Sequence, residues 1–218
     1  MAPHLSEAEY LVDYLRLPEC PATNNVYKEP DEPNVVTWGP PGDATTWQVR
    51  AQCASFLTAV HARTYPSWAT AEFFQTYFSS SSPLARDYQQ VWAAGTAPHF
   101  QPVSQVSQLQ PGDLIAIDYQ NGQQTNTGHV VMVRRLKGSY TSPSSTLNFP
   151  GETQYAVEIV DCTSDPHGVF GIGDYFAFPD TRIVDGVNDR QGAGFGHLMC
   201  YASQTGVPKI VGRFGFDR

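Results

Sequence analysis

The pattern of secondary structure along this chain of 218 residues changes once, at Pro111-Gly112. Before that dipeptide, apolar side chains recur at helical spacing. After it, β-branched or alternating segments are bounded by Gly, Asn or Pro. The alternating strand and helix order of a Rossmann or flavodoxin fold is absent. Helices first and strands afterwards predict an α+β fold, in which N-terminal helices pack on an antiparallel sheet.

Four segments ahead of Pro111 have helical patterns. In the first, Ser6 is the expected N-cap, Glu9 completes a capping box, and Pro18 ends the helix. The second starts at a cysteine and is stopped by Pro66. The predicted helices are Ser6–Leu17, Cys53–Tyr65, Ser67–Phe78 and Pro83–Ala94.

Strand patterns fill most of the chain beyond Gly112. A Ser/Thr/Pro-rich insertion, Tyr140–Gly151, separates two of them. The glycine-rich run Gly192–Gly196 leads into a strand-like segment and not into a helix, so a turn is expected there and not a phosphate-binding loop. The predicted strands are Asp113–Tyr119, Gly128–Leu136, Gln154–Asp161, Tyr175–Phe178 and Gly196–Ala202.

The length suits one ordinary domain, or a domain with an arm. Residues 18–46 are rich in Pro, Asn, Asp and Gly, which predicts a long irregular segment. We therefore expect residues 1–46 to form a helix and an irregular arm, and residues 47–218 to form a single compact domain.

Charge and hydropathy exclude two classes of partner. The net charge is -8 and the isoelectric point about 5.1, so the chain has no basic face for nucleic acid. It also has no apolar run long enough to span a membrane. Met1–Arg16 is polar and does not resemble a signal peptide. The compartment stays open: secreted or periplasmic if a leader has been trimmed, otherwise cytoplasmic or delivered by a signal-independent route.

The four cysteines lie far apart in the sequence, with no Cys-x-x-Cys pair, so a zinc site is unsupported. Whether Cys20, Cys162 and Cys200 form disulfides is open, and Cys162 is expected to face the core. Cys53 is different because it opens a predicted helix. Unpaired N–H groups and the helix dipole at that position favour a thiolate, which is the reactive form of cysteine.

Two further residues complete a possible catalytic set with Cys53. His129 begins the strand after the turn at residues 121–127, and Asp161 ends the next predicted strand. An imidazole takes the proton of a thiol, and a third polar group fixes the orientation of the imidazole. The order Cys53, His129, Asp161 therefore predicts an activated nucleophile. The alternatives are a core thiol, a histidine bonded to backbone and a turn-forming aspartate.

The motifs around these residues resemble the NlpC-type papain-like cysteine peptidases and amidases, over about residues 47–161. The resemblance rests on the helical Cys53–Leu57 (Cys-Ala-Ser-Phe-Leu), on Pro111–Leu114 (Pro-Gly-Asp-Leu) before a strand, and on Gly128–Val131 (Gly-His-Val-Val). It implies a papain-like fold for residues 47–218. It also implies hydrolysis of an amide bond, in a bacterial cell-wall peptide or a related peptide, through a thioester on Cys53. No cofactor or metal is implied.

Other residues are candidates for substrate or oxyanion contacts. The backbone N–H of Cys53 is one expected oxyanion donor, and Gln48 is a candidate for the second. Trp38 and Trp47 either wall a substrate cleft or belong to the core. His167 either lines the cleft as a substrate contact or is a solvated turn residue.

Two other functions stay open. One is acyl transfer on the same triad, as in a transglutaminase-like amide exchanger. The other is a binding module that has kept the papain-like fold without activity. The second is kept because the residues around Cys53 depart from the family pattern: Gln52 stands where that family usually has Asp, and Ala54-Ser55 where it usually has Gly.

Overall fold

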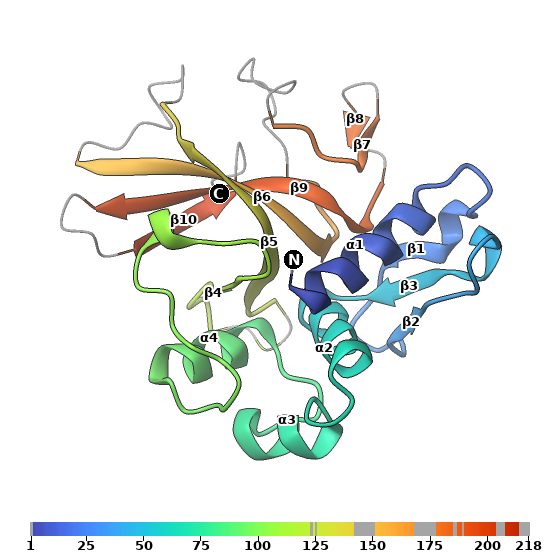
Figure 1. Cartoon of the computed structure of the whole chain (residues 1–218), viewed down its shortest axis with the longest axis horizontal. Helices are drawn as coiled ribbons and strands as arrows, with labels where there is room; N and C mark the ends of the chain where they lie inside the picture. The colour runs from blue at the N-terminus through green and yellow to red at the C-terminus, as the bar shows by residue number, and fades with distance from the viewer. Residues whose placement is uncertain are drawn as a thin grey trace.

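The computed structural model shows an α+β protein, as the order of patterns predicts. It describes residues 2–122, 124, 126–141, 151–167, 178–184, 187–188, 190–203 and 208–213. A five-stranded antiparallel sheet forms one layer, and helices lie against one part of it (Figure 1). The predicted strand Tyr175–Phe178 lies outside the described residues except for Phe178, which is in a bend. Most of the Tyr140–Gly151 insertion also lies outside them.

The large sheet has the order β10-β9-β6-β5-β4. Three of its strands are each twelve residues long, and they pair with antiparallel neighbours over most of their length. In β5 and β6, β-branched residues favour the extended strand, because they fit a pleated surface that is buried on both sides. The strands are β4 (Leu114–Asp118), β5 (Gly128–Ser139), β6 (Glu152–Thr163), β9 (Gly192–Ser203) and β10 (Pro208–Arg213).

The N-terminal part of the chain adds a helix and a small sheet. The helix α1 (Pro3–Leu15) buries Leu5, Leu11 and Val12 in the main core. The central strand β3 (Gln48–Ala51) pairs in parallel with β1 (Asn25–Tyr27) and antiparallel with β2 (Val35–Thr37). Residues 1–46 therefore share a core and a sheet with the rest of the chain, and the segment expected to be irregular contains two short strands.

Three more helices complete the helical layer. The helix α2 (Cys53–Thr64) packs against β5 and β6, while α4 (Ala85–Ala94) packs against β4 and β5. The helix α3 (Ala71–Phe78) contacts α4 and adds Phe73, Phe74 and Phe78 to the core. The main core thus lies between the helices and one face of the large sheet, and a second cluster around Val131, Val133 and Ile159 lies apart from it.

The predicted starts of three helices were wrong. The fourth helix begins at Ala85 and not at Pro83, and the other two differ for identifiable reasons. The first helix begins at Pro3 and not at Ser6, since a proline fits the first turn with its φ already fixed. Ser6 lies inside that helix, and Ala2 is its N-cap. The third begins at Ala71 and not at Ser67, because the hydroxyl of Thr70 accepts the N–H of Phe73 and caps it there.

The glycine-rich run at residues 192–196 is the start of β9 and not a turn. Two elements had no signal in the sequence: the two-residue strands β7 (Ile183–Val184) and β8 (Val187–Asn188), which pair only with each other. The strand β10 was also not predicted, and it pairs with β9 at the edge of the large sheet.

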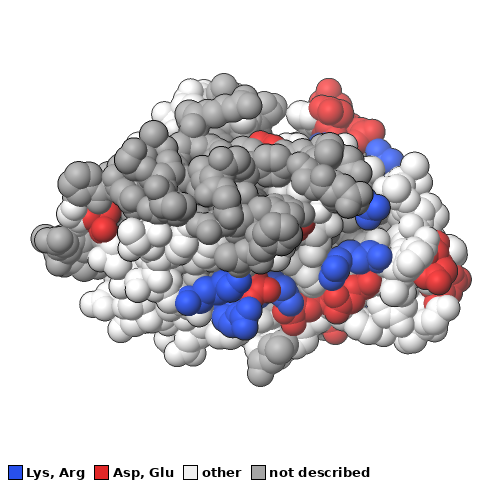
Figure 2. All heavy atoms as spheres, turned by 90° about the horizontal axis from the view of Figure 1, so that it is seen from above, with Lys and Arg blue, Asp and Glu red and all other residues white. Residues whose placement is uncertain are grey.

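Acidic and basic side chains are interspersed on the face of the molecule seen in Figure 2, without a continuous basic surface. Arg134 forms ion pairs with Glu9 and with Glu158. Within the described residues, no helix is long and apolar enough to cross a bilayer.

Candidate active site

Cys53 is the first residue of α2 and is buried. The chain reaches it from β3 through Gln52, whose extended backbone makes it the N-cap. The Gln52 N–H donates to the Ser55 hydroxyl at 2.9 Å, which fixes the first turn. The thiol therefore lies beside the positive end of a helix dipole, as its position in the sequence predicts.

His129 is the second residue of β5 and lies opposite Ile117 of β4. The residue before it must be small, because a Cβ on Gly128 would collide with the carbonyl oxygen of Ile117. The imidazole is buried, and its Nε2 atom lies 2.7 Å from Oδ2 of Asp161. Because Nε2 faces Asp161, Nδ1 is the ring nitrogen available for the hydrogen bond with Cys53.

Asp161 lies near the end of β6, and its carboxylate is fully buried. Burial alone would raise the pKa of this acid. The positive charge of Arg182 and hydrogen bonds from His129 and His167 instead hold the pKa well below its usual range. Asp161 is therefore ionised at neutral pH and acts as an acceptor for the two imidazoles.

The electrostatics of the site favour a thiolate and imidazolium pair. Burial would raise the pKa of Cys53, but the charge and hydrogen bond of His129, together with the backbone N–H of Val130, lower it. Burial would lower the pKa of His129, but Cys53 and Asp161 raise it to about 10. Both shifts favour the state in which the proton resides on the imidazole and not on the sulfur.

His167 is fully buried and belongs to the same cluster. Its Nε2 atom lies 2.9 Å from Oδ2 of Asp161 and 3.0 Å from Nε2 of His129. Burial lowers the pKa of His167 to about 4, although Asp161 acts in the opposite direction, so this ring is neutral at pH 7. It is not a solvated turn residue, since its side chain is fully buried and contacts Asp161.

The contacts fix how the protons are arranged. Asp161 only accepts, so Nε2 of each imidazole carries the hydrogen that points at Oδ2. The 3.0 Å between the two nitrogens then follows from two donors meeting at one oxygen. In a neutral His167 this arrangement leaves Nδ1 as a lone pair. That atom is buried and has no hydrogen-bond partner within the described part of the chain.

A buried ion pair supports the cluster from behind. The guanidinium of Arg182 holds Asp180 through two contacts, Nε to Oδ1 at 2.8 Å and Nη2 to Oδ2 at 2.7 Å. Nη2 also lies 2.9 Å from Oδ1 of Asp161, within range of an ion pair but without hydrogen-bond geometry. Asp180 in turn accepts the backbone N–H of His167 at 2.7 Å. The carboxylate and the second imidazole are thus anchored together.

The glycines of β9 make room for this ion pair. A Cβ on Gly194 would meet the side chain of Arg182, and one on Gly196 would meet Asp180 and the carbonyl of His167. Gly194 lies opposite Asp161 in the sheet. The glycine-rich run therefore has a packing function: it lets charged side chains lie directly on the sheet beside the site.

Three side chains of this cluster have the chemistry of metal ligands, namely those of His129, Asp161 and His167. Their facing atoms are 2.7, 2.9 and 3.0 Å apart. Ligands of a tetrahedral zinc ion with bonds of about 2.0–2.1 Å are about 3.3 Å apart. The observed distances are those of hydrogen bonds, and the neighbouring Arg182 already neutralises Asp161. The arrangement fits a hydrogen-bonded cluster better than a set of metal ligands.

Three predicted contact residues are not brought to the thiol. Gln48 lies at the opposite end of β3, five extended residues or about 16 Å from Cys53. Trp47 is 1% exposed and stacks on Tyr14 in the core, with its Nε1 donating to the Pro40 carbonyl. Trp38 donates from Nε1 to the Glu7 carbonyl of α1. The tryptophans therefore secure the N-terminal helix and do not line the site.

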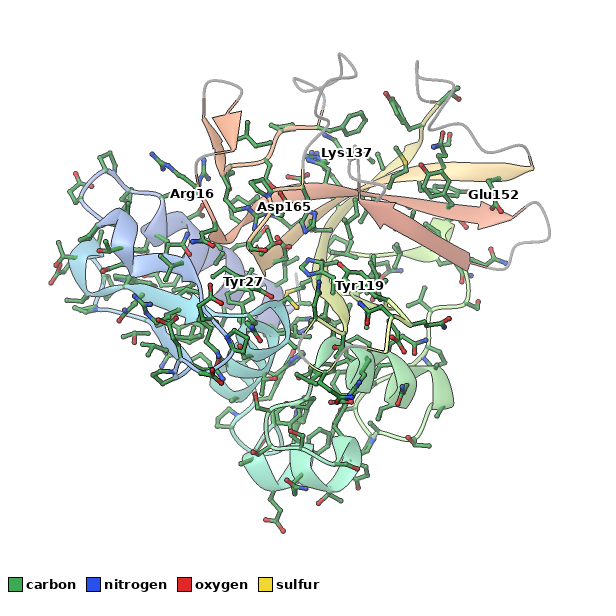
Figure 3. The ribbon with its side chains drawn as sticks, turned by 180° about the vertical axis from the view of Figure 1, so that it is seen from behind. Arg16, Tyr27, Tyr119, Lys137, Glu152 and Asp165 are labelled. Carbon is green, nitrogen blue, oxygen red and sulfur yellow. The ribbon has the colours of Figure 1, made fainter. Side chains whose placement is uncertain are left out.

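Three of the residues labelled in Figure 3 come from segments that lie next to the strands and the helix of the triad. In this view Tyr27, Asp165 and Tyr119 are arranged around the region where α2, β5 and β6 meet. Tyr27 pairs with Ala51, two residues before Cys53. The backbone N–H of Tyr119 donates to Thr127, two residues before His129.

All four cysteines are buried and unpaired. Cys162 lies in the main core, where its thiol contacts the Ala51 carbonyl at 3.2 Å, and burial raises its pKa well above the usual range. Cys200 is also buried, and its pKa is raised to about 12. Cys53 is thus the cysteine whose surroundings favour the thiolate.

Sequence reasoning missed the anchoring pair Asp180 and Arg182. Neither residue lies in a motif, and they reach the triad only because a loop folds back over β9. The signal that was present is the spacing of Gly194 and Gly196, which alternate on one face of a strand and leave space above it.

Comparison with known proteins shows a similarity to a viral protein. The chain is 28% identical to a protein of Acanthamoeba polyphaga mimivirus that is described as uncharacterized, over 185 residues, which are 81% of this chain and 73% of the viral one. No family model matches the chain, and no solved structure matches it.

Proposed function

We propose that this protein is a papain-like cysteine hydrolase of the NlpC type that cleaves an amide bond. The observation that carries the proposal is the buried chain of contacts from Asp161 to His129 to Cys53. Two features support it further: the thiol begins a helix, and its pKa is lowered in spite of complete burial. A structural cysteine in an apolar core has its pKa raised, as Cys162 and Cys200 do.

The geometry supports a two-step reaction. The Cys53 thiolate attacks the amide carbon, and the oxyanion that forms accepts from the backbone N–H of Cys53. His129 gives its Nδ1 proton to the leaving nitrogen, so an amine departs and a thioester remains. Water then loses a proton to His129 and attacks the thioester. The products are a carboxylic acid and the free thiol.

Throughout both steps Asp161 stays ionised and keeps Nε2 of His129 protonated, which directs Nδ1 toward the sulfur. The substrate class, a bacterial cell-wall peptide or related peptide, follows from the resemblance of the Pro-Gly-Asp-Leu and Gly-His-Val-Val segments.

The test is digestion of purified bacterial peptidoglycan and of a mixed peptide-amide library, followed by mass spectrometry of the products. We expect new amine and carboxylate ends with the native protein and none with Cys53→Ala. Cys20→Ala is the matched control, since Cys20 is also buried and unpaired but lies away from the triad. Cleavage that survives Cys53→Ala would disprove the proposal.

The same experiment distinguishes hydrolysis from acyl transfer on the same triad. In water enriched in heavy oxygen, hydrolysis places the label in the new carboxylate. Transfer to an added primary amine gives an unlabelled amide instead. A protein that yields neither product, and whose Cys53 reacts with iodoacetamide no faster than a free thiol, would be an inactive binding module.

A further inference from the structure

A cavity of about 720 Å³ lies between α4, β4 and the loop that precedes β4. Cys53, His129 and Asp161 are not among the residues that line it. The volume falls within the range of pockets that bind small molecules and cofactors. It is thus a separate site that the proposed hydrolase mechanism does not use.

Aromatic rings form much of the wall. The ring of Phe100 contacts those of Trp92, His61 and Trp68, with centroids 5.4, 5.8 and 5.9 Å apart. His99 stacks on Trp68 at 4.4 Å and has a positive φ of 69°, a strained conformation for a residue other than glycine. Such walls favour flat, apolar ligands that stack or meet edge to face.

The charges of the cavity restrict the ligand. No Lys or Arg side chain is among the residues that line it. Its one carboxylate, Asp113, accepts the backbone N–H of Gln110 at 2.7 Å. A phosphate or carboxylate ligand would lose its hydration there without gaining a cation, which is costly. The cavity therefore disfavours an anionic ligand.

His61 supplies a fixed polar contact in this apolar wall. Its Nδ1 lies 3.1 Å from the Leu57 carbonyl, which can only accept, so the hydrogen is on Nδ1. Burial lowers the pKa of His61 to about 3, so the ring is neutral. Nε2 is then a lone-pair acceptor, and no described residue donates a hydrogen bond to it. His4, the neighbouring ring, uses both of its nitrogens on Tyr65 and Gly112.

We propose that this cavity binds a neutral planar aromatic molecule that donates a hydrogen bond to Nε2 of His61. The rings of Trp68, Trp92 and Phe100 define the shape of the cavity and stack on the ligand. The hydrogen bond to His61 orients the ligand. Binding at this site is independent of whether Cys53 is catalytic.

The test is a titration of the full-length, nitrogen-labelled protein with indole, followed by NMR of the four tryptophan side-chain N–H groups. Benzofuran is the matched probe, because it has nearly the same shape but no N–H donor. We expect indole to shift the signals of Trp68 and Trp92, which line the cavity, and to leave those of Trp38 and Trp47 unchanged. Benzofuran should bind about 2- to 10-fold more weakly, the value of one buried hydrogen bond.

Two variants complete the experiment. His61→Phe should abolish the difference between indole and benzofuran, because the acceptor is lost while the ring is kept. Val103→Trp, at a rim residue that is 41% exposed, should weaken both probes without disturbing the core. It therefore tests the site even if His61→Phe does not fold. Equal affinities of the two probes for the native protein, or shifts spread over all four tryptophans, would overturn the proposal.

Discussion

The Nε2 atoms of His129 and His167 lie 3.0 Å apart because both donate to the same oxygen of Asp161. A single carboxylate therefore orients two imidazoles, of which only His129 contacts the thiol. The other ring is neutral and fully buried, so it holds Asp161 in place without competing for the proton of Cys53.

Replacing the shared acceptor tests this arrangement most directly. In Asp161→Asn the amide has a single acceptor oxygen and no charge. If that oxygen takes the place of Oδ2, the NH₂ group faces the guanidinium of Arg182; if the amide is flipped, the NH₂ group faces both imidazole donors. We expect kcat of the proposed hydrolysis to fall by about 10²–10⁴-fold, the range for loss of an oriented base. Steady-state kinetics on the cleaved substrate measure the effect. An unchanged kcat would show that Asp161 does not orient His129.

His167→Phe separates a positioning function from direct catalysis. Without the hydrogen bond from His167, Asp161 is held less firmly. We expect kcat to fall about tenfold while KM is unchanged, if the fully buried His167 acts on the reaction through Asp161 alone. The pH profile of kcat should also change, because Asp161, which accepts the hydrogen bond from His129, is held less firmly. His197→Phe is the matched control, since His197 is another buried histidine with a pKa lowered to about 4, and it lies outside the hydrogen-bonded cluster. Equal effects of the two variants would point to packing alone.

The lowered pKa of Cys53 predicts an unusual reactivity profile. The reactivity of an ordinary thiol with a pKa of about 8.5 falls steeply as the pH drops below that value, whereas His129 beside Cys53 lowers the pKa of Cys53 and favours its thiolate. Iodoacetamide labelling of Cys53, measured by mass spectrometry, should therefore fall less between about pH 8.5 and 6.5 than labelling of a free thiol does.

The control for this profile is His129→Ala. Without the imidazolium, burial alone acts on the thiol and raises its pKa. We expect labelling at pH 6.5 to fall by about tenfold or more, since one pKa unit changes the thiolate fraction tenfold at such pH. A native profile that rises with pH in the same way as the variant would contradict the ion pair.

How much of this site was predictable from sequence depends on the distance over which its parts interact. Cys53 and His129 are each marked by local features, a helix start and a glycine before a strand. The change from helical to strand patterns at Pro111-Gly112 predicted the α+β class. His167 was singled out, but as a cleft or turn residue, because nothing in Asp165-Pro166-His167 shows that the chain there turns inward.

Arg182 and Asp180 mark the limit of that reasoning. A buried arginine cannot be told from a surface one by its sequence neighbours, since its burial depends on charges brought from β6 and on space left by β9. The N-terminal strands β1 and β2 were missed for a similar reason. Each has only three residues, and their pairing with β3 is a tertiary contact that outweighs the local Pro and Asn content.

Removing the arginine should be costly to the fold. In Arg182→Met, Asp161 and Asp180 lose their cation while remaining buried, and broken buried pairs cost about 3–5 kcal/mol. We expect a loss of that size in the free energy of unfolding, measured with urea. Arg182→Lys should be only slightly more stable than Arg182→Met, because an ammonium cannot reproduce the two-point contact with Asp180.

The control is Arg16→Met, at an exposed arginine, which should change the free energy of unfolding by less than about 1 kcal/mol. Equal stabilities of Arg182→Met and Arg16→Met would contradict the anchoring function.

Mild acid should destabilise the protein through its buried neutral histidines. The pKa of His61 is lowered to about 3, and those of His167 and His197 to about 4. Between pH 6.5 and about 4 the unfolded chain binds protons at these sites and the folded chain does not, so stability falls as the pH falls. Each fully buried histidine contributes up to about 1.4 kcal/mol per pH unit.

The raised pKa of His129 acts in the other direction and only above pH 6.5, where its contribution to stability declines as the pH rises toward 10. Urea unfolding at pH 6.5, 5.5 and 4.5 measures the slope. His61→Phe should reduce that slope by the share of one histidine, whereas an unchanged slope would show that His61 is protonated in the folded state.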